Sequence, residues 1–430
     1  MRELRHVPRL RGPRRQVQGG GARAGERAGR SRGKRSRRGG SVRGAVQSDR
    51  GLIWATLILG LVGIVAVYTA SVHIAEHSFG GSHVFLKRNA VRAVVGLAAL
   101  LFAYRIDYRS YRRHATKAVV MAIVLLGLTL GLGTAIRGMR ARLFMFQPGE
   151  LAKLALVFYM ADVMVRRKGE LEGFKYGVLP RLILAGIVIG LILLQPDFGN
   201  ALAVAVLTLI LLFLGGARLT HVGGLAALAG IGGYFAIKTV PHIIERWQVW
   251  RASYDLSLSG LDTEGAGYQI YQSLVALGSG GLIGRGVGES MQRAFIPDPY
   301  TDFAFSIWGE ELGLLGTIGV VALFALVLWR GLRIAKRAPD EYGTVLAAGL
   351  TAMITVYAVI NIGVATALFP TTGLPLPFIS YGGSSLVVNM AAIGVLLNMS
   401  KRVVPEPGSV SSLRIPVRKR GAHARKRKKE

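Results

Sequence analysis

The sequence contains no cysteine, which excludes a disulfide framework, a thiolate zinc site and a cysteine nucleophile. Acidic residues are also few: 23 Asp and Glu stand against 54 Lys and Arg, so the formal net charge is +31. Only 18% of the 430 residues are charged and 51% are hydrophobic, with uncharged apolar runs along most of the chain. Several runs approach the ~20 residues with which a helix spans a bilayer. We therefore predict an all-α polytopic membrane protein.

A cleavable signal peptide is not expected either, because the first fifty residues are polar and rich in arginine. Residues 1–50 hold 16 Lys and Arg against 3 acids, and residues 401–430 hold 11 against 2. Such tails are typical of nucleic-acid binding or of disordered cytoplasmic arms that bind anionic membrane lipids. We favour the second interpretation. It predicts basic tails at 1–50 and 404–430 around a membrane domain at 51–403, with no nucleic-acid partner.

The apolar segments predict ten transmembrane helices, at residues 52–72, 89–105, 117–135, 149–165, 180–195, 199–215, 219–239, 303–329, 343–368 and 378–399. The connections 106–116, 166–179 and 330–342 are basic. The positive-inside rule places them in the cytoplasm, and an even number of spans places both termini there too. The opposite connections are short except 240–302, and a loop of that length is usually functional.

Two motifs suggest chemistry that the surrounding sequence does not support. The stretch HIAEH (73–77) fits a zinc-binding pattern, but its neighbours give no sign of a long helix to hold both histidines on one face. The stretch GSGGLIGRGVG (278–288) lacks the Gly-Lys-Ser/Thr of a phosphate loop and does not follow a strand. We predict no metal-binding residues. The glycines fit either a backbone in close approach to a lipid surface or ligand, or a flexible loop.

A group of acids opens the eighth segment, in IPDPYTDFAFSIWGEELG (296–313). Two prolines keep the chain extended, so a helix is expected to begin near Thr301. Asp302, Ser306 and Glu310 then share one face, with Asp302 at the outer membrane boundary and Glu310 about 12 Å deeper. Asp302 fits either an N-cap or first-turn acid of this helix or a functional carboxylate. Glu310 lies too deep for a cap and needs a buried partner.

A second polar group surrounds the start of the fourth segment. In QPGELAK (147–153), Glu150 and Lys153 have the spacing of a helical ion pair. The alternative is that Lys153 receives an anionic headgroup near the outer leaflet. Three arginines just before this motif form an outer basic cluster, against the charge rule, which favours an anionic ligand: Arg137, Arg140 and Arg142.

A third polar group lies between two strong spans, in FPTTGLPLPFISYGGSS (369–385). Broken backbone at membrane depth is tolerated only where protein or a water-filled cavity surrounds it. We therefore predict a re-entrant or cavity-lining element here rather than a surface loop. In QPDFGNA (195–201), Asp197 is interpreted as the cap of the next helix.

Together these motifs resemble the SEDS family (shape, elongation, division and sporulation proteins), the bacterial peptidoglycan polymerases. The resemblance follows the family's order and rests on QPGELAK (147–153), QPDFGNAL (195–202), YQSLVALGSGGLIGRGVG (271–288), TDFAFSIWGEELGLLG (301–316) and NIGVATALFPTTGLPLPFISYGGSS (361–385). The GEELG and PTTGLPLPFISYGGSS variants look more like the division branch (FtsW) than the elongation branch (RodA).

The resemblance implies a ten-helix fold and transfer of glycosyl groups between lipid II molecules on the outer face of the bacterial cytoplasmic membrane. It implies a class B penicillin-binding protein, the transpeptidase, and other divisome or elongasome membrane proteins as partners. The family's essential aspartate corresponds to Asp302. We predict that the substrate is bound by Gln147, Glu150, Lys153, Arg140, Arg142, Gln272, Glu310, Ser380 and Ser384.

The chain departs from the family's pattern at three places. Tyr300 stands where a histidine is usual, and Gly149 stands where a serine is usual. The stretch GMRARLFMF (138–146) is shorter than the family's equivalent and lacks its tryptophan.

The implied reaction joins the 4-hydroxyl of one sugar to the anomeric carbon of another, and a lipid pyrophosphate leaves. A sugar hydroxyl is a weak nucleophile at neutral pH, so a carboxylate base helps, and we assign that role to Asp302. Pyrophosphate leaves without a paired acid but needs cations, for which Lys153 ranks first and the arginine cluster second. No cofactor is certain, and Mg²⁺ or Mn²⁺ at the pyrophosphate stays open. Two alternatives remain: a transporter that flips lipid II, and a non-catalytic division scaffold.

Overall fold

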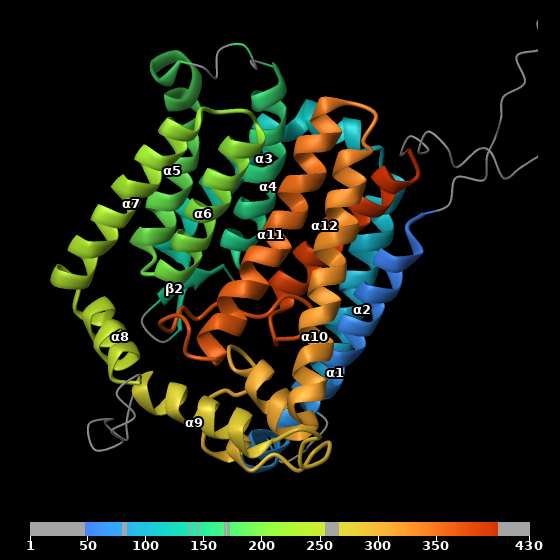
Figure 1. The fold of residues 1–430 in the computed structure, drawn as a ribbon, viewed down its shortest axis with the longest axis vertical. Helices are drawn as coiled ribbons and strands as arrows, with labels where there is room; N and C mark the ends of the chain where they lie inside the picture. The colour runs from blue at the N-terminus through green and yellow to red at the C-terminus, as the bar shows by residue number, and fades with distance from the viewer. Residues whose placement is uncertain are drawn as a thin grey trace, which may run out of the picture. The chain divides into compact units, whose positions relative to one another are not determined.

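The computed structural model is mainly helical (Figure 1) and describes residues 48–79, 84–136, 139–143, 146–166, 169, 173–253 and 266–402. Its elements in chain order are α1 (Arg50–Phe79), α2 (Val84–Arg105), α3 (Tyr108–Leu132), β1 (Thr134–Ile136), β2 (Met139–Arg142), α4 (Pro148–Arg166), the π-helix η2 (Phe174–Val178), α5 (Leu179–Leu194), α6 (Phe198–Leu214), α7 (Leu219–Thr239), α8 (Pro241–Ala252), α9 (Ala266–Ser279), the 3₁₀-helix η4 (Gln292–Ala294), α10 (Ala304–Lys336), α11 (Glu341–Ala365) and α12 (Gly383–Ser400). Nearly all of both predicted tails lies outside the described residues, so the division into three parts stays a prediction.

The predicted fold class, an all-α polytopic membrane protein, is confirmed, with a single short antiparallel hairpin of β1 and β2 in the described chain. A helix lies in each of the ten predicted segments. Within the described residues, seven helical segments are long and apolar enough to cross a membrane. The number of ten crossings therefore stays a prediction.

Five predicted helix ends are wrong by five or more residues. The first helix runs to Phe79 rather than 72 and the second begins at Val84 rather than 89. The third begins at Tyr108 rather than 117, the eighth predicted helix runs to Lys336 rather than 329, and the last begins at Gly383 rather than 378. Asp107 caps α3 by accepting a hydrogen bond from the Arg109 amide. Hydropathy misses the polar start of α3 and the polar end of α10 because side chains there pair with neighbouring elements, as Arg109 does with Asp340 and Arg330 with Asp49.

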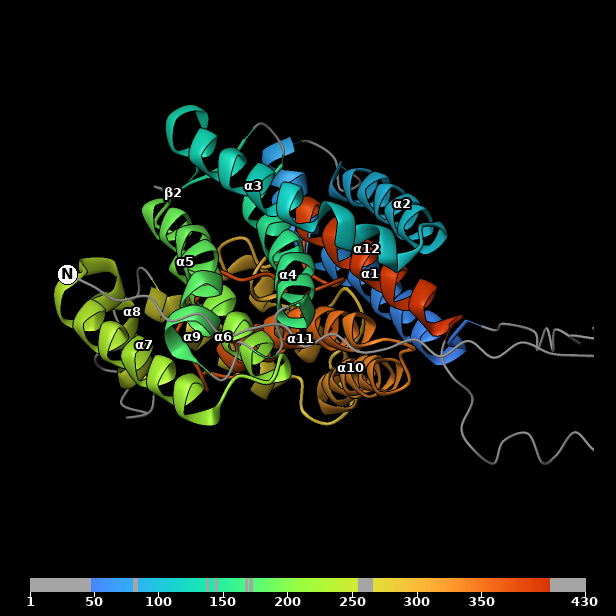
Figure 2. The same cartoon turned by 90° about the horizontal axis from the view of Figure 1, so that it is seen from above.

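The interior is built on α4, α11 and α12, whose residues are mostly buried. Helix α11 packs against α4, α6 and α10, and α12 packs against α2. Viewed along the helices, α4 and α11 lie in the middle and α7 lies at an edge (Figure 2). None of the residues of α7, all of which are described, is buried. Helix α7 is therefore the least packed of the long helices.

The end at which α3 and α11 begin and α4 and α12 finish carries most of the described ion pairs. These pairs are Arg109–Asp340 (3.0 Å), Arg112–Asp162 (2.8 Å), Arg166–Asp162 (2.6 Å), Arg330–Asp49 (3.5 Å) and Arg402–Asp107 (2.9 Å). Burial would raise the pKa of Asp340, but hydrogen bonds from Tyr108 and Arg109 outweigh burial and leave the pKa below its ordinary value. We call this end the basic end.

The predicted loop 240–302 contains two helices, α8 and α9, which lie across the opposite end of the molecule, where α10 begins (Figure 1). Trp250 of α8 donates a hydrogen bond from Nε1 to the carbonyl oxygen of Ala367 at 2.9 Å. The indole thereby joins α8 to the segment that follows α11.

The HIAEH stretch lies on a helix, contrary to the sequence-based expectation, because α1 continues to Phe79. The side chains of His73 and His77 lie outside the described residues. The stretch therefore gives no further information about a metal site.

The glycine-rich stretch 278–288 packs against a break in α10. At Gly313 the backbone leaves the helical region (φ 65°, ψ −161°). Four backbone hydrogen bonds join the two segments: Arg285 N to Glu310 O (3.0 Å), Gly286 N to Glu311 O (3.0 Å), Leu314 N to Gly281 O (2.9 Å) and Leu315 N to Leu282 O (3.2 Å). The sequence-based expectation named a lipid surface or ligand, or a flexible loop, whereas the structure shows this backbone in close approach to a helix of its own chain. The loop supplies partners for backbone groups that the broken helix leaves unpaired.

Gly284 is the residue in this stretch that tolerates a side chain least. It has φ +84°, and a Cβ here would collide with the Glu311 carbonyl oxygen. We expect Gly284→Ala to lower the free energy of unfolding by about 2 kcal/mol or more, because both the left-handed backbone and the contact disfavour a side chain. Thermal unfolding of the purified protein in detergent measures this effect.

Gly278→Ala is the matched control for this substitution. It lies in the same stretch, at the end of α9, and a Cβ there meets no atom within 4 Å. An equal, small effect of both substitutions would contradict the packing described for the loop.

Candidate active site

A cavity of about 270 Å³ opens at the end of the molecule where α10 begins. Seven elements or connections contribute its lining, which consists of Arg142, Gln147, Pro196, Asp197, Phe198, Arg246, Asp298, Tyr300, Thr301, Asp302, Thr372, Gly373 and Tyr381. Three carboxylates and two guanidinium groups therefore share one space with amide, hydroxyl and aromatic groups.

Asp302 lies in the turn just before α10 and is half-buried. The N-cap residue of α10 is Phe303, with no side-chain cap in the described structure. The alternative that Asp302 is an N-cap is therefore wrong. Its backbone carbonyl accepts a hydrogen bond from Asn361 Nδ2 at 2.8 Å. A Cβ added to Gly373 would lie 3.9 Å from Asp302 Oδ2, so the carboxylate lies beside the backbone of that residue.

The two other carboxylates of the cavity have structural partners. Asp298, which has φ +49°, accepts a hydrogen bond from Tyr300 Oη at 2.9 Å. Asp197 caps α6, as predicted, accepting from Asn200 N at 3.2 Å, from Asn200 Nδ2 at 2.7 Å and from Gln147 Nε2 at 3.4 Å. Burial raises the pKa of Asp197 despite these hydrogen bonds.

The cations of the cavity come from two different connections. Arg142 ends β2 and is exposed. Arg246 lies on α8 and donates from Nη1 to the Thr371 carbonyl oxygen at 3.2 Å. Arg140 belongs to the same strand as Arg142, but its side chain lies outside the described residues, as does Arg137. Of the predicted arginine cluster, the structure thus brings Arg142 to the cavity.

The segment 366–382, between α11 and α12, has no helix and supplies Thr372, Gly373 and Tyr381 to the cavity wall. This agrees with the predicted cavity-lining element. The segment lies against the start of α6, because a Cβ on Gly199 would collide with the Thr372 carbonyl oxygen. We call residues 366–382 the strap.

The two serines that were predicted to bind the substrate stabilise the strap and the start of α12, and neither lines the cavity. Ser380 is buried, and its Oγ accepts a hydrogen bond from the Leu376 amide at 2.9 Å, which closes a turn of the strap. Ser384 Oγ accepts from the Gln147 amide at 2.9 Å and so ties the start of α12 to the residue before α4. Direct substrate binding by either serine stays a prediction.

Lys153 and Glu150 form a fully buried ion pair, with Nζ and Oε2 2.6 Å apart and side-chain exposures of 0% and 1%. The contact lies outside hydrogen-bond geometry, so it is mainly electrostatic. Lys153 Nζ also lies 3.7 Å from the centroid of the Tyr357 ring. Tyr357 Oη in turn donates to Asn200 Oδ1 at 3.0 Å. The pair therefore lies behind the cavity wall rather than on its surface.

Glu310 has buried partners, as predicted, but the structure does not bring it to the cavity. Its oxygens accept hydrogen bonds from Ser279 Oγ (3.3 Å), Arg285 Nη1 (3.1 Å), Ser290 Oγ (2.5 Å), Met291 N (3.2 Å) and Gln292 N (3.1 Å). These contacts hold the 279–292 connection against α10. A carboxylate so fully occupied has no acceptor position left for a ligand.

Gln272 lies half-buried on α9 and is not among the cavity residues. Conversely, sequence reasoning missed Arg246, Asp298 and the cavity position of Tyr300. Arg246 lies in the long connection 240–302, which was expected to be functional, but nothing in the sequence singled out this arginine. Sequence reasoning named Tyr300 only because it stands where the family usually has a histidine, and assigned it no place in a site.

Within the part of the chain that the structure describes, no group of three His, Asp or Glu residues is arranged to hold an ion. Mg²⁺ is usually held by one or two carboxylates together with waters and substrate phosphates, so Mg²⁺ or Mn²⁺ at the pyrophosphate stays a prediction.

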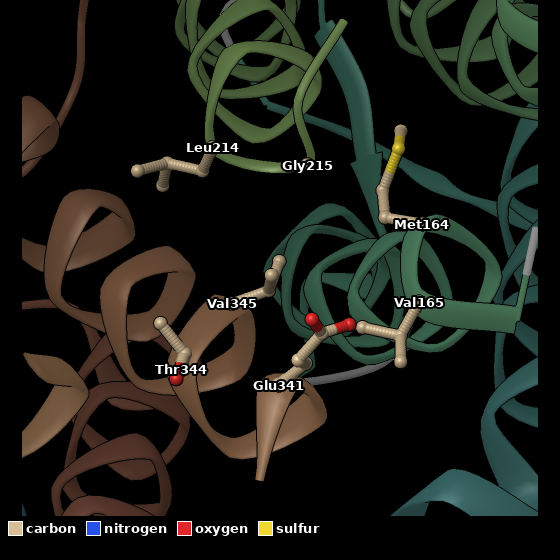
Figure 3. A pocket seen from close by; sticks show the side chains of 7 residues that line it. All are labelled: Met164, Val165, Leu214, Gly215, Glu341, Thr344 and Val345. Carbon is tan, nitrogen blue, oxygen red and sulfur yellow. The ribbon is translucent and has the colours of Figure 1, made fainter. Parts of the chain in front are cut away.

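A second cavity, of about 210 Å³, lies at the opposite, basic end (Figure 3). It is lined by Met164, Val165, Leu214, Gly215, Glu341, Thr344 and Val345. Its side chains are mostly apolar, and Glu341 brings the only charge among them. A neutral or cationic group could lie here, but the charges that an anionic substrate requires are found at the cavity with Asp302.

Comparisons with known proteins agree on the relationship of this chain. The family model described as "Cell cycle protein", for FtsW, RodA and SpoVE, matches residues 50–404. A "Probable peptidoglycan glycosyltransferase FtsW" of Geobacter metallireducens is 38% identical over 84% of this chain and 96% of the relative. "Stage V sporulation protein E" of Bacillus subtilis is 38% identical over 81% of this chain and 96% of the relative.

Two solved structures have a similar fold. The first is described as "Structural coordination of polymerization and crosslinking by a peptidoglycan synthase complex". Its similar chain has a TM-score of 0.68 and 30% identity, over 83% of this chain and 98% of that one. The second is the rod shape determining protein RodA of Thermus thermophilus, with a TM-score of 0.59 and 29% identity over 84% of this chain and 98% of that one.

Proposed function

The chain belongs to the cell cycle protein family of FtsW, RodA and SpoVE, and from that premise we propose that it is a peptidoglycan glycosyltransferase that polymerises lipid II. The resemblance identified from the motifs is thereby confirmed. The observation that supports the activity best is the cavity in which Asp302 lies with Arg142 and Arg246. Relatives at 38% identity carry the name FtsW, which supports a role in septal wall synthesis.

Asp302 acts as the general base in this proposal. Its carboxylate takes the proton from the 4-hydroxyl of the acceptor sugar as the hydroxyl oxygen forms a bond to the donor's anomeric carbon. The bond from that carbon to the pyrophosphate oxygen breaks, and the electron pair leaves with the lipid pyrophosphate. The proton on Asp302 then passes to solvent through the cavity opening.

Arg142 and Arg246 hold the leaving pyrophosphate. A guanidinium is always charged and presents paired N–H donors that match phosphate oxygens. The sequence ranks Lys153 before the arginines as the cation for the pyrophosphate. Because Lys153 is buried beside Glu150, the structure favours the arginines instead. We therefore assign Lys153 to the support of the cavity wall, through Tyr357 and Asn200.

The membrane orientation follows from the charge distribution. The basic end faces the cytoplasm by the positive-inside rule, so the cavity with Asp302 opens on the outer face of the bacterial cytoplasmic membrane. Both tails are then cytoplasmic. The similarity to a chain from a peptidoglycan synthase complex supports a transpeptidase, a class B penicillin-binding protein, as partner. Other divisome or elongasome proteins and membrane lipids complete the expected partners.

Arg246→Gln is expected to lower kcat/KM for lipid II by about 30- to 100-fold, because one preorganised donor to the developing negative charge is lost. Initial rates of polymerisation over a range of lipid II concentrations measure this effect.

Arg251→Gln is the matched control, because Arg251 lies on the same helix, is exposed, and is not part of the cavity lining. It is expected to keep the wild-type rate. An unchanged kcat/KM in Arg246→Gln would remove Arg246 from the proposed pyrophosphate site.

The activity itself is tested with purified protein, fluorescent lipid II and a gel that resolves glycan length, with and without the transpeptidase. We expect polymer that depends on the protein. Movement of labelled lipid II across vesicles without any polymer would favour a transporter instead. Absence of both activities would favour a scaffold.

A further inference from the structure

The carbonyl group of Asp302 is not part of the hydrogen-bond ladder of α10. The amides of Ser306 and Ile307 both donate to the carbonyl oxygen of Phe303, at 2.9 and 3.2 Å. The ladder therefore begins one residue after Asp302. The Asp302 carbonyl instead accepts from Asn361 Nδ2, on α11, at 2.8 Å.

The same nitrogen of Asn361 makes a second contact, to the other wall of the cavity. It donates to the carbonyl oxygen of Leu374, in the strap, at 2.7 Å. A side-chain amide has two N–H donors, and both are used here on backbone carbonyls. Because a carbonyl oxygen only accepts, the nitrogen and not the oxygen of Asn361 must face these two partners.

Asn361 is 1% exposed, and its Oδ1 has no hydrogen-bond partner among the described residues. A buried polar atom without a partner is unfavourable and uncommon in proteins. Simple core filling would not require an amide at this position. The two donors are therefore the feature of this side chain that needs an explanation.

The two contacts fix the carboxylate of Asp302 relative to the strap. Gly373, directly before Leu374, has its Cα beside the Asp302 carboxylate, as the 3.9 Å distance from a Cβ there to Oδ2 indicates. Asn361 thus joins the turn that carries the carboxylate to the backbone that borders it. A backbone hydrogen bond from Tyr381 N to Tyr300 O, at 2.9 Å, also joins the strap to this turn, but Asn361 is the side chain that contacts Asp302 itself and the residue next to Gly373.

We infer that Asn361 is a positioning residue, which holds the carboxylate of Asp302 at a fixed distance from the strap through two hydrogen bonds of its side-chain amide. The inference rests on the proposed role of Asp302 as general base. A base displaced by about 1 Å loses much of its effect, while the pyrophosphate contacts of the substrate stay in place. Loss of Asn361 therefore lowers kcat far more than it changes KM.

Kinetics of Asn361→Ala on fluorescent lipid II, using the full chain, test the inference. We expect kcat to fall about 100-fold with KM within about threefold of wild type. Asn361→Asp, of the same shape but without donors when ionised, is expected to fall at least as far. A wild-type kcat, or a change confined to KM, would overturn the inference.

Asn398→Ala separates positioning from general stability. Asn398 is also buried and also bridges backbone groups, donating to the Tyr104 carbonyl oxygen at 2.8 Å and accepting from the Tyr108 amide at 3.2 Å, but at the basic end. We expect it to lower Tm as Asn361→Ala does while kcat stays near wild type. An equal loss of kcat in both variants would make Asn361 merely structural.

Asn361→Ser decides the question if Asn361→Ala does not fold, because serine keeps one donor. We expect an intermediate kcat at unchanged KM, and a wild-type kcat would contradict the inference.

Asp302→Ala in the same assay distinguishes failure of the inference from failure of the proposed function. If Asp302→Ala is inactive and the Asn361 variants are normal, only the inference fails. If Asp302→Ala is active, the proposed base itself is wrong.

Discussion

Replacing Asp302 by asparagine is expected to lower the rate of glycan polymerisation by about 1,000-fold, within the range that a positioned base contributes. Asparagine has nearly the same size as aspartate, and the contact from Asn361 goes to the backbone, so the turn before α10 keeps its anchor. An amide cannot accept the proton of the sugar hydroxyl at neutral pH. The initial rate of polymer formation by the purified variant measures this loss directly, and its thermal unfolding shows that the fold persists.

Asp298→Asn is the matched control for this result. Asp298 lines the same cavity, has φ +49° and accepts from Tyr300 Oη. Asparagine tolerates that backbone conformation and still offers an oxygen to Tyr300. We expect activity within a few-fold of wild type. If Asp298→Asn abolished polymer formation and Asp302→Asn did not, the assignment of Asp302 as the base would be wrong and Asp298 would take its place.

Replacing Lys153 by methionine is expected to destabilise the folded protein by about 3–5 kcal/mol, because the ionised partner Glu150 would stay buried without its cation. Both side chains are almost completely buried and lie 2.6 Å apart. The sequence alone ranks Lys153 first among the cations for the pyrophosphate, and on that basis a substitution would weaken the use of lipid II with only a modest loss of folding. Yield of folded protein and thermal unfolding in detergent measure the effect.

The double variant Glu150→Gln/Lys153→Met tests this explanation. Removing both charges of a buried pair is often close to neutral, so we expect stability to return to within about 1 kcal/mol of wild type. Recovery of stability with recovery of activity would show that Lys153 supports the cavity wall. A stable double variant that no longer binds lipid II would instead support direct contact between Lys153 and the substrate.

The membrane segments were predictable because each is a long run of apolar residues, and a helix lies in every one of them. The polar ends of these helices were not predictable in the same way. The first two turns of α3 hold Arg109 and Arg112, which sequence reasoning placed in a cytoplasmic loop but which pair with Asp340 and Asp162. Hydropathy cannot distinguish a basic loop from a basic helix turn whose acidic partners lie far away in the sequence.

The residues of the site divide along similar lines. The strap was predicted from sequence because a surface loop fits poorly with its many apolar residues. Asp302 fits a helix cap by local pattern, and the resemblance to the family singled it out. Arg246 gave no such signal, since an arginine in a polar loop is ordinary. Its place in the cavity depends on α8 lying over the strap, which is a tertiary contact.

Sequence could mark some residues as special without identifying their partners, as it did for Glu150, Lys153 and Glu310. Their positions in apolar segments indicated that they have special roles, and burial with partners is one such role. Sequence does not reveal whether the partner is a substrate or another part of the chain. For Glu310 the partners include Arg285 and Ser290, about two dozen residues away along the chain.

The most direct test is a structure of the protein with lipid II in both the donor and acceptor positions. The account predicts a distance of about 2.6–3.2 Å between a carboxylate oxygen of Asp302 and the acceptor's 4-hydroxyl oxygen, with the donor pyrophosphate against Arg142 and Arg246. An acceptor hydroxyl that lies beyond the reach of Asp302, even through one water, would contradict the proposed mechanism.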